Sequence, residues 1–256
     1  MTQAIILAGG EGKRMAGTDG YALKSAVKIQ GKTLLEWQLE QLERSGIKKV
    51  TIYTSEVTPQ GALDEYARST SNLGIDIDIK EKPLKIGSLG CVKDALLEIP
   101  ADEDLVVLYG DIFSDINLGT MLERHQKSGF LATLAKIKGD HVPYGMIEDD
   151  SNGLITSFKE KGDLQYNSGI AVVKGEVGYR LLRVPPEIND FFTGVQNLHK
   201  AGLRAFGTYT HEGYWRDVKD MSVVTETEQA IRESKIILPN AGSIKGEGST
   251  GSAEVK

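Results

Sequence analysis

The stretch AIILAGGEGKRM, residues 4–15, decides the fold class. It begins with a short apolar run, and such a run ending in glycine predicts a β-strand buried on both faces of a parallel sheet. The glycines that follow leave the backbone almost bare, so its N–H groups can turn toward an anion. Lys13 and Arg14 add positive charge at the same point. The stretch therefore predicts a phosphate-binding turn, although it has neither the ending of a Walker loop nor the glycine spacing of a dinucleotide fingerprint.

Strand and helix signals alternate from this stretch to residue 125. The apolar and alternating patterns predict further strands, and the helical spacing of leucines and similar patterns predict helices. The strands are expected at 49–53, 75–79 and 105–109, and the helices at 33–45, 62–69 and 88–98. Gly46 follows the first helix as its C-terminal stop. The alternation is typical of βαβ units, so we expect a mostly parallel sheet.

The second half of the chain is less regular and predicts further strands of a mixed sheet. These strands are expected at 130–138, 145–148, 154–158, 170–174 and 203–210, with a helix ending near 196–201 and a last helix at 221–235 capped by Asp220. We expect one α/β domain over residues 1–236, in which 1–125 and 126–236 form two halves. The Gly/Ser-rich residues 237–256 are predicted to be a flexible tail.

Composition excludes several classes of function. The chain has 256 residues and a net charge of −6, whereas a nucleic-acid binder would usually carry a basic excess. Its longest apolar runs fall short of the roughly 18 residues that a membrane span needs, and no signal-peptide pattern opens the chain. The single cysteine, Cys91, excludes an internal disulfide and a multi-cysteine zinc site. We therefore expect a cytoplasmic protein with neither a nucleic-acid nor a membrane partner.

The glycine-rich turn resembles the signature of the sugar-1-phosphate nucleotidylyltransferase family, and the segments Leu23-Lys24-Ser25 and Gly31-Lys32 are similar to the lysine segment that follows it. The resemblance implies a single Rossmann-like domain of GT-A type, with a mixed, mostly parallel central sheet flanked by helices. It also implies that Arg14 supports the leaving pyrophosphate and that Lys24 contacts the α-phosphate, where negative charge develops. The residues expected to bind the nucleotide in this region are Leu7, Ala8, Gly9, Gly10, Gly12 and Lys13.

Two later segments resemble the family's nucleobase and metal motifs. Gly87 and Ser88 open a predicted helix and are expected to contact the base, and the nearby Glu81 is a candidate acceptor for guanine N–H groups. Asp111 follows a buried strand, where open α/β sheets bind ligands, and Asp217 lies in a segment similar to Gly-x-Trp-x-Asp. Two carboxylates together with phosphate oxygens form a hard oxygen site, so the resemblance implies a Mg²⁺ cofactor.

The family's sugar-pocket motifs also occur here in the same order. By resemblance, the pocket and its phosphate contacts are assigned to Tyr144, Gly145, Glu160, Lys161, Asn167, Gly169 and Trp215, with Lys161 on the acceptor phosphate. His125 is read as a structural helix residue. The other histidines, His141, His199 and His211, show no metal-ligand spacing and are expected on the surface.

The resemblance implies transfer of a nucleotidyl group from an NTP to a sugar 1-phosphate, giving an NDP-sugar and pyrophosphate. The sugar phosphate is largely dianionic at neutral pH, so no general base is required. Neither the sugar nor the base (uracil, thymine, guanine or cytosine) is fixed by the sequence. Three alternatives stay open: cytidylyl transfer to a phospho-alcohol such as phosphocholine or inositol phosphate, guanylyl transfer to a molybdenum cofactor, and a non-catalytic regulator that binds nucleotide sugars. The family often forms dimers or tetramers, so a homo-oligomer is among the expectations.

Overall fold

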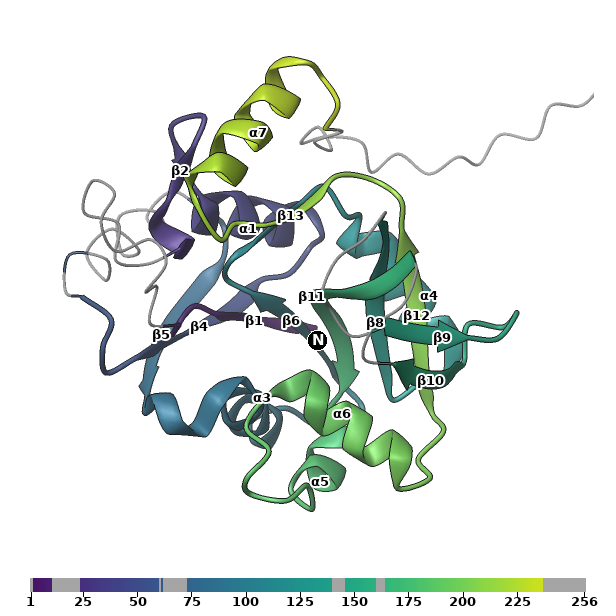
Figure 1. Cartoon of the computed structure of the whole chain (residues 1–256). Helices are drawn as coiled ribbons and strands as arrows, with labels where there is room; N and C mark the ends of the chain where they lie inside the picture. The colour runs from purple at the N-terminus through teal and green to yellow at the C-terminus, as the bar shows by residue number, and fades with distance from the viewer. Residues whose placement is uncertain are drawn as a thin grey trace, which may run out of the picture.

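A central mixed sheet organises the molecule (Figure 1). The structure, a computed structural model, describes residues 2–10, 24–59, 61, 73–139, 146–159 and 164–236. Within them one sheet of nine strands follows the order β10-β9-β11-β6-β1-β4-β5, and β8 and β12 extend it beside β11. The expectation of one α/β fold with a mixed sheet is confirmed. The predicted helix at 62–69 and the predicted tail at 237–256 lie outside the described residues.

The first half of the chain supplies the parallel strands. β1 lies between β4 and β6 and is parallel to both, so that Ala4 pairs with Val50 on one side and Val106 on the other. β5 continues the parallel set on the far side of β4. The strands are β1 (Gln3–Leu7), β4 (Lys49–Ser55), β5 (Asp76–Lys82) and β6 (Asp104–Tyr109). Because the apolar residues of β1 and β6 are buried almost completely, the continuous apolar runs read correctly as strands covered on both faces.

The second half adds strands that pair mainly antiparallel. β11 (Leu164–Lys174) runs antiparallel to β6 and joins the two halves. It also pairs antiparallel with β8 and β9, while β12 runs parallel to β8. The remaining bounds are β8 (Ala132–Gly139), β9 (Met146–Asp149), β10 (Ile155–Lys159) and β12 (Phe206–His211). The predicted strands are therefore confirmed, and β11 extends further toward its start than the pattern indicated.

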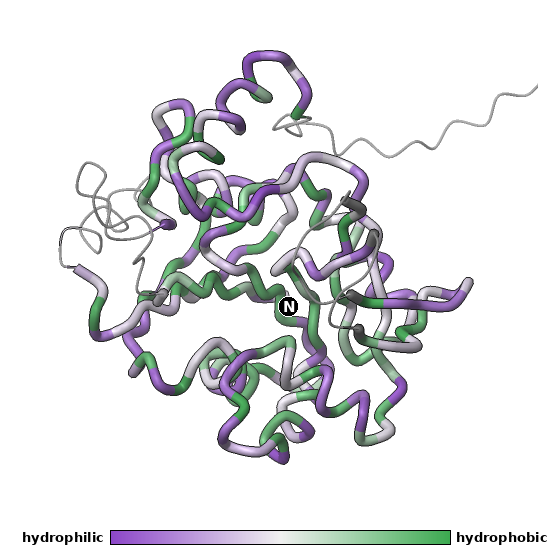
Figure 2. Tube along the Cα trace, in the orientation of Figure 1, coloured by the Kyte–Doolittle hydropathy of each residue, from purple (hydrophilic) through white to green (hydrophobic). Residues whose placement is uncertain are grey.

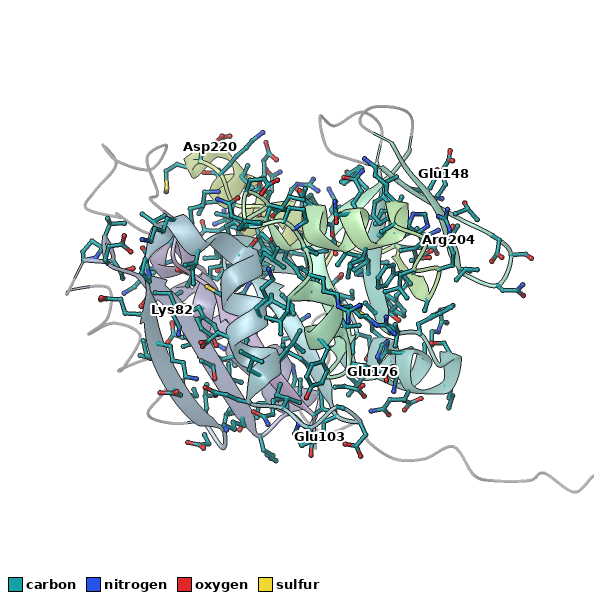
Figure 3. The ribbon with its side chains drawn as sticks, turned by 90° about the horizontal axis from the view of Figure 1, so that it is seen from below. Lys82, Glu103, Glu148, Glu176, Arg204 and Asp220 are labelled. Atoms are coloured by element: carbon teal, nitrogen blue, oxygen red, sulfur yellow. The ribbon has the colours of Figure 1, made fainter. Side chains whose placement is uncertain are left out.

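Helices cover both faces of the sheet, and each face has its own apolar core. One face packs against α3 (Gly87–Leu97), α5 (Val177–Leu181) and α6 (Phe191–Lys200). The opposite face packs against α1 (Leu34–Arg44) and α4 (Leu118–Ser128). Seen from below, α3 and α6 lie across the first of these faces (Figure 3). The apolar parts of the trace gather along the central strands (Figure 2).

Helix α1 shows why the local sequence folds as predicted. The side chain of Thr33 accepts a hydrogen bond from the N–H of Glu36, and the Glu36 carboxylate accepts one from the N–H of Thr33. This capping box satisfies two N–H groups that the first helical turn leaves unpaired. Gly46, with a φ of 79°, follows the last turn. Glycine takes this left-handed conformation at little cost, so the chain leaves the helix there.

Smaller elements connect the helices to the sheet. η1 (Lys24–Ala26) leads into a hairpin of β2 (Lys28–Ile29) and β3 (Lys32–Thr33). β7 and β13, Ile112–Ser114 and Trp215–Asp217, form a separate antiparallel ribbon. α7 (Met221–Arg232) packs on the hairpin and begins at Asp220, whose carboxylate accepts hydrogen bonds from the N–H groups of two residues of the first turn, as predicted. In the part of the chain described here, no helix combines the length and the apolar character needed to cross a bilayer.

Candidate active site

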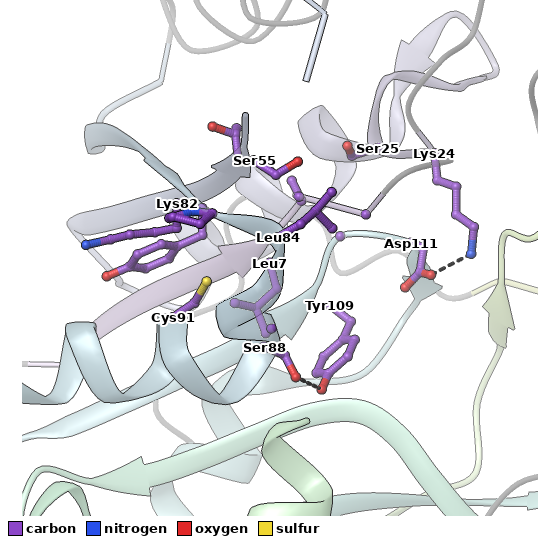
Figure 4. Close-up of a pocket in the computed structure, with 18 residues that line it drawn as sticks. Leu7, Lys24, Ser25, Ser55, Lys82, Leu84, Ser88, Cys91, Tyr109 and Asp111 are labelled. Atoms are coloured by element: carbon purple, nitrogen blue, oxygen red, sulfur yellow. Dashed lines mark hydrogen bonds and ion pairs between the residues drawn. The ribbon is translucent and has the colours of Figure 1, made fainter. Parts of the chain in front are cut away.

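A cavity of about 490 Å³ lies at the carboxyl ends of the parallel strands (Figure 4). Parallel strands place their carboxyl ends at one edge of a sheet, and ligands of open α/β sheets bind at that edge. The described residues that line it lie at the ends of β1, β4, β5 and β6, in η1 and η2 (Leu84–Ile86), and in the first turns of α3. Four separate strand ends therefore surround one volume.

Bare backbone forms the wall at the end of β1. Leu7, Ala8, Gly9 and Gly10, which were predicted to bind the nucleotide, all line the cavity. A Cβ atom on Gly9 would lie 3.1 Å from the carbonyl carbon of Thr54, a tighter contact than Cβ atoms usually make. Glycine thus lets the turn pack closely against the end of β4. Gly12, Lys13 and Arg14 lie outside the described residues.

The two acids assigned to a metal ion meet beside this wall. The Lys24 ammonium lies 2.7 Å from Oδ2 of Asp111 and 3.6 Å from Oδ1 of Asp217. The β7–β13 ribbon brings the acids together, because it pairs Asp217 with Ile112, the residue after Asp111. The N–H of Val218 also donates to the carbonyl oxygen of Asp111 at 2.8 Å. All three charged side chains are between one fifth and one third exposed. Lys24 and Asp111 line the cavity, whereas Asp217 is not part of the described cavity wall.

The donor set at this point fits a hard divalent cation. Carboxylate oxygens from two segments face one position that already accommodates a positive charge, and Mg²⁺ prefers such oxygen ligands. Among the described residues, no group of three or more histidine, cysteine, aspartate or glutamate side chains is arranged to hold a metal alone. Mg²⁺ commonly uses one or two carboxylates together with substrate phosphates, so Asp111 and Asp217 fit a cation that arrives with a phosphate ligand.

A hydrogen-bonded cluster joins two residues of the cavity wall, Tyr109 and Ser88, to the start of α6. The Tyr109 hydroxyl lies 2.8 Å from Oγ of Ser88 and 2.9 Å from Oδ2 of Asp190, the N-terminal cap of α6. The N–H of Phe191 donates to Oγ of Ser88 at 2.8 Å. Burial raises the pKa of Tyr109 well above its usual value, and the nearby Asp190 charge raises it further. The cluster therefore holds the first turn of α3, predicted to meet the base, against the second half of the chain.

Gly87 shows why that turn needs glycine. Its φ is 60°, and a Cβ atom there would overlap the carbonyl oxygen of Asn189. Asn189 also accepts a hydrogen bond from the N–H of Leu89 at 2.9 Å. Gly87 and Ser88 line the cavity, so the structure brings both predicted residues into the site.

Glu81 does not join them. It is exposed on β5 and is absent from the described cavity wall, which Lys82 lines instead. Strand residues alternate between faces, and Lys80 and Lys82 point to α3, where their ammonium groups meet Glu98 and Asp94. Glu81 therefore points to the opposite face. The isoleucines at alternate positions before it were the available signal, because they mark the face that it shares.

Tyr53 and Lys82 form a further wall that the sequence reasoning missed. The Tyr53 hydroxyl donates to Oδ2 of Asp94 at 2.8 Å, and the Lys82 ammonium donates to Oδ1 at 2.7 Å. Burial alone would raise the pKa of Asp94, but hydrogen bonds from Lys82 and Tyr53 lower it overall. Burial also raises the pKa of Tyr53 far above its usual value. These side chains therefore present a neutral phenol and a paired ammonium beside α3.

The predicted sugar-side residues that the structure describes also lie together. The side-chain amide of Asn167 faces the turn that follows it, because its Oδ1 accepts a hydrogen bond from the N–H of Gly169 at 3.1 Å. The Trp215 indole donates to the carbonyl oxygen of Ser168 at 2.8 Å. Gly169 has a φ of 78°, and a Cβ atom there would lie 3.0 Å from Cγ1 of Ile112. Asn167, Gly169 and Trp215 thus gather beside β7. The other sugar-side candidates, Tyr144, Gly145, Glu160 and Lys161, lie outside the described residues.

Two of the histidines lie elsewhere than predicted. His125 is a fully buried helix residue, as predicted, and its Nδ1 lies 2.8 Å from the Thr133 hydroxyl. His199 and His211 are buried rather than on the surface. His211 lies 3.1 Å from Oδ1 of Asp115, and His199 pairs with the carbonyl oxygen of Ile155. Burial lowers the pKa of His199. Each ring finds polar partners inside the fold, which a search for metal-ligand spacing does not reveal.

Comparison with known proteins places this geometry in a family. The family model described as nucleotidyl transferase matches residues 3–234. A D-glycero-alpha-D-manno-heptose 1-phosphate guanylyltransferase of Campylobacter jejuni is 32% identical over 62% of this chain and 68% of its own length. A UTP–glucose-1-phosphate uridylyltransferase of Synechocystis is 29% identical over 68% of this chain. The chain spans 50% of the Synechocystis protein and 50% of a Sulfolobus acidocaldarius relative that is 32% identical.

Solved structures support the fold. HddC from Yersinia pseudotuberculosis superposes with a TM-score of 0.72 at 22% identity and covers 90% of this chain and all of its own. A glucose-1-phosphate thymidylyltransferase structure from Bacillus anthracis superposes with a TM-score of 0.77 at 17% identity, covering 90% of this chain and 95% of its own. At these identities the likeness shows the fold alone.

Proposed function

The chain belongs to the nucleotidyl transferase family, and from that premise we propose that it transfers a nucleotidyl group from a nucleoside triphosphate to a sugar 1-phosphate. In this reaction an oxygen of the sugar phosphate attacks the α-phosphorus. The bond between the α-phosphorus and the bridging oxygen to the β-phosphorus breaks, and pyrophosphate leaves with the electron pair. No proton transfer is needed, because the acceptor phosphate is already ionised. The protein must therefore align the reactants and neutralise charge.

The convergence of Asp111 and Asp217 carries the proposal. These acids come from distant parts of the chain, and both lie within 4 Å of the ammonium of Lys24, a residue that lines the cavity. In the proposal they hold a divalent cation, which when bound would neutralise charge on the triphosphate and orient its oxygens. Lys24 places an ammonium next to the position of the α-phosphate. A fixed positive charge at that point stabilises the charge that develops during transfer.

The remaining roles follow the family pattern. The bare backbone from Leu7 to Gly10 and the first turn of α3 both line the cavity. In the proposal the former binds the triphosphate and the latter binds the base. Arg14 is assigned to the leaving pyrophosphate and Lys161 to the acceptor phosphate. Sugar 1-phosphates are the acceptors in the names of the Campylobacter and Synechocystis relatives, which supports this acceptor class for the chain. The two names differ in the nucleotide, guanylyl against uridylyl, so the proposal leaves the base open.

The direct test is a pyrophosphate-release assay. The purified chain is incubated with Mg²⁺ and a panel that pairs each NTP with several sugar 1-phosphates. We expect release only when both substrates are present, and loss of release when a chelator removes the cation. A panel row with CTP and phosphocholine or inositol phosphate tests the phospho-alcohol alternative. Tight nucleotide binding with no release in any row would instead support a non-catalytic regulator.

Site variants make the test specific. Asp111→Asn keeps the shape of the side chain and removes its charge, so we expect kcat to fall on the order of 10²–10³-fold, as for the loss of one preorganised electrostatic contact. Asp220→Asn is the matched control, because Asp220 caps α7 and asparagine is an equally good cap. Its activity should equal that of the unaltered protein. Equal activity of both variants would contradict the assignment of Asp111.

A further inference from the structure

Helix α1 carries two glutamines on its buried face. Gln38 and Gln41 are 5% and 8% exposed, and they lie among leucines that are fully buried. A buried amide is unfavourable unless it forms hydrogen bonds. Two such residues on a face that packs against the sheet therefore call for partners, and their partners lie next to the acids of the site.

Gln38 bonds to both ends of the turn that presents Asp111. Its Nε2 donates to the carbonyl oxygen of Tyr109 at 2.9 Å and to that of Ile112 at 2.8 Å. Only Gly110 and Asp111 lie between these two carbonyls. Both amide hydrogens of one side chain thus fix the turn from the side of α1. From the other side, the N–H of Gly110 donates to the carbonyl oxygen of Leu7 at 2.9 Å.

The segment that Gln38 holds is also bonded to the backbone around Asp217, the second acid. Ile112 pairs with Asp217 in the β7–β13 ribbon, and the N–H of Val218 donates to the carbonyl oxygen of Asp111 at 2.8 Å. A shift of the segment from Tyr109 to Ile112 would therefore move both carboxylates. Gln41 contacts the part of the chain that follows this segment: its Nε2 donates to the carbonyl oxygens of Ser114 and Ile116 at 3.1 Å and 2.8 Å.

We propose that Gln38 is a positioning residue that sets the separation of Asp111 and Asp217, and through it the affinity of the cation site. The inference rests on the proposed function, because it takes these two carboxylates as the cation's ligands. Gln38 bonds to main-chain oxygens and acts through the backbone rather than by contact with a substrate. Residues that hold metal ligands in place typically change metal affinity when they are replaced.

The test compares two methionine variants. Methionine is close to glutamine in length but donates no hydrogen bond, so Gln38→Met and Gln41→Met each remove two donations from a buried amide. Mn²⁺ alone is titrated into each protein, and the free ion is followed by electron paramagnetic resonance. We expect Gln38→Met to weaken binding about 10-fold, the lower end of the range for residues that orient metal ligands. Gln41→Met should lower the melting temperature about as much as Gln38→Met does. It should, however, leave Mn²⁺ affinity within about twofold of that of the unaltered protein.

Hydrogen–deuterium exchange gives a readout that needs no metal. The amides of Gly110 and Val218 should exchange about 10-fold faster in Gln38→Met and at an unchanged rate in Gln41→Met, because local opening there depends on the lost donations. Gln38→Asn, whose shorter amide cannot span both carbonyls, replaces Gln38→Met if that variant does not fold. An unchanged exchange rate and Mn²⁺ affinity in the Gln38 variant, or equal losses in both glutamine variants, would overturn the positioning role. If the unaltered protein binds no Mn²⁺ that depends on Asp111 while exchange still responds to Gln38, the cation site of the proposed function fails and the control of the turn by Gln38 stands.

Discussion

The two halves of the molecule build their parts of the site by different means. Up to residue 125, the cavity is lined by the ends of parallel strands, and parallel strands all end at the same edge. Beyond that residue the strands pair mainly antiparallel and end at both edges. There the predicted sugar-side residues come from a turn inside β11, at Asn167–Gly169, and from β13, a strand outside the main sheet. The first half thus gathers its candidate residues by strand topology, whereas the second half gathers them by local features of single turns and short strands.

The largest expected effect tests whether the halves share one cation, since Asp111 belongs to the first half and Asp217 to the second. Each single change to asparagine should lower kcat on the order of 10²–10³-fold. If both acids hold the same cation, the double variant should be little worse than either single one, because the effects of residues that act as a unit do not add. Steady-state pyrophosphate release measures all three variants. If instead the two fold-losses in kcat multiply in the double variant, the two acids act independently and do not hold the same cation.

Cys91 reports on the first half alone. It lines the cavity from α3, and burial raises the pKa of its thiol to about 11. Only the thiolate reacts, so labelling by a disulfide reagent at pH 8 should be about 100-fold slower than that of a free cysteine and should accelerate with pH. A bound NTP should protect the thiol further, and a sugar 1-phosphate should not. Equal protection by both ligands would contradict the division between the halves.

Gly169 tests the local feature of the second half. Its φ of 78° disfavours a side chain, and a Cβ atom would lie 3.0 Å from Cγ1 of Ile112. Gly169→Ala should lower the free energy of unfolding by about 1–2 kcal/mol from the backbone alone, and crowding against Ile112 should add to this. Gly129→Ala is the matched control, with a φ of 71° and no atom within 4 Å of its Cβ position. Denaturant unfolding gives the loss in free energy of unfolding for both variants, and the difference between the two losses is the contribution of crowding. Equal losses would mean that crowding against Ile112 contributes nothing.

The smallest effect concerns a contact between the halves, far from the cavity. Asp104 begins β6 and meets His125, Gln126 and Lys174. Burial would raise its pKa, but the hydrogen bonds from His125 and Gln126 lower it overall. A carboxyl with a lowered folded-state pKa contributes stability above its ordinary pKa, and this contribution is lost as pH falls through the folded value. Asp104→Asn should therefore cost about 1 kcal/mol at neutral pH, and the difference from the unaltered protein should vanish in strong acid. A difference independent of pH would show that its charge is not involved.

The same contrast explains what the sequence could and could not predict. β1 and β6 were predictable because each is a continuous apolar run, β5 because its isoleucines alternate with polar residues, and α1 because its leucines recur at helical spacing. The ribbon of β7 and β13 was not, because strands of three residues show no periodicity and their pairing joins distant segments. α5 was not predicted either, because five residues are too few to show helical periodicity.

The candidate site shows a similar limit. Gly9, Gly87 and Asp111 were found because glycines and an acid at strand ends have a local meaning. Whether Glu81 or Lys82 faces the cavity depends on the face of β5 that packs on α3, which the apolar alternation indicates only once the position of α3 is known. Nothing in the sequence singled out Gln38, and only the fold shows that it is buried and lies beneath the turn of Asp111.

The pairing of β11 with β6 also bears on how this chain could be divided. β6 bonds to β1 on one side and to β11 on the other, with Ile170 opposite Leu108 and Lys174 opposite Asp104. A fragment that stopped after the first half would uncover a row of unsatisfied N–H and C=O groups along an apolar strand. Such an open edge is a template for joining identical copies, so the fragment would be prone to aggregate. The two halves are therefore expected to depend on each other for folding.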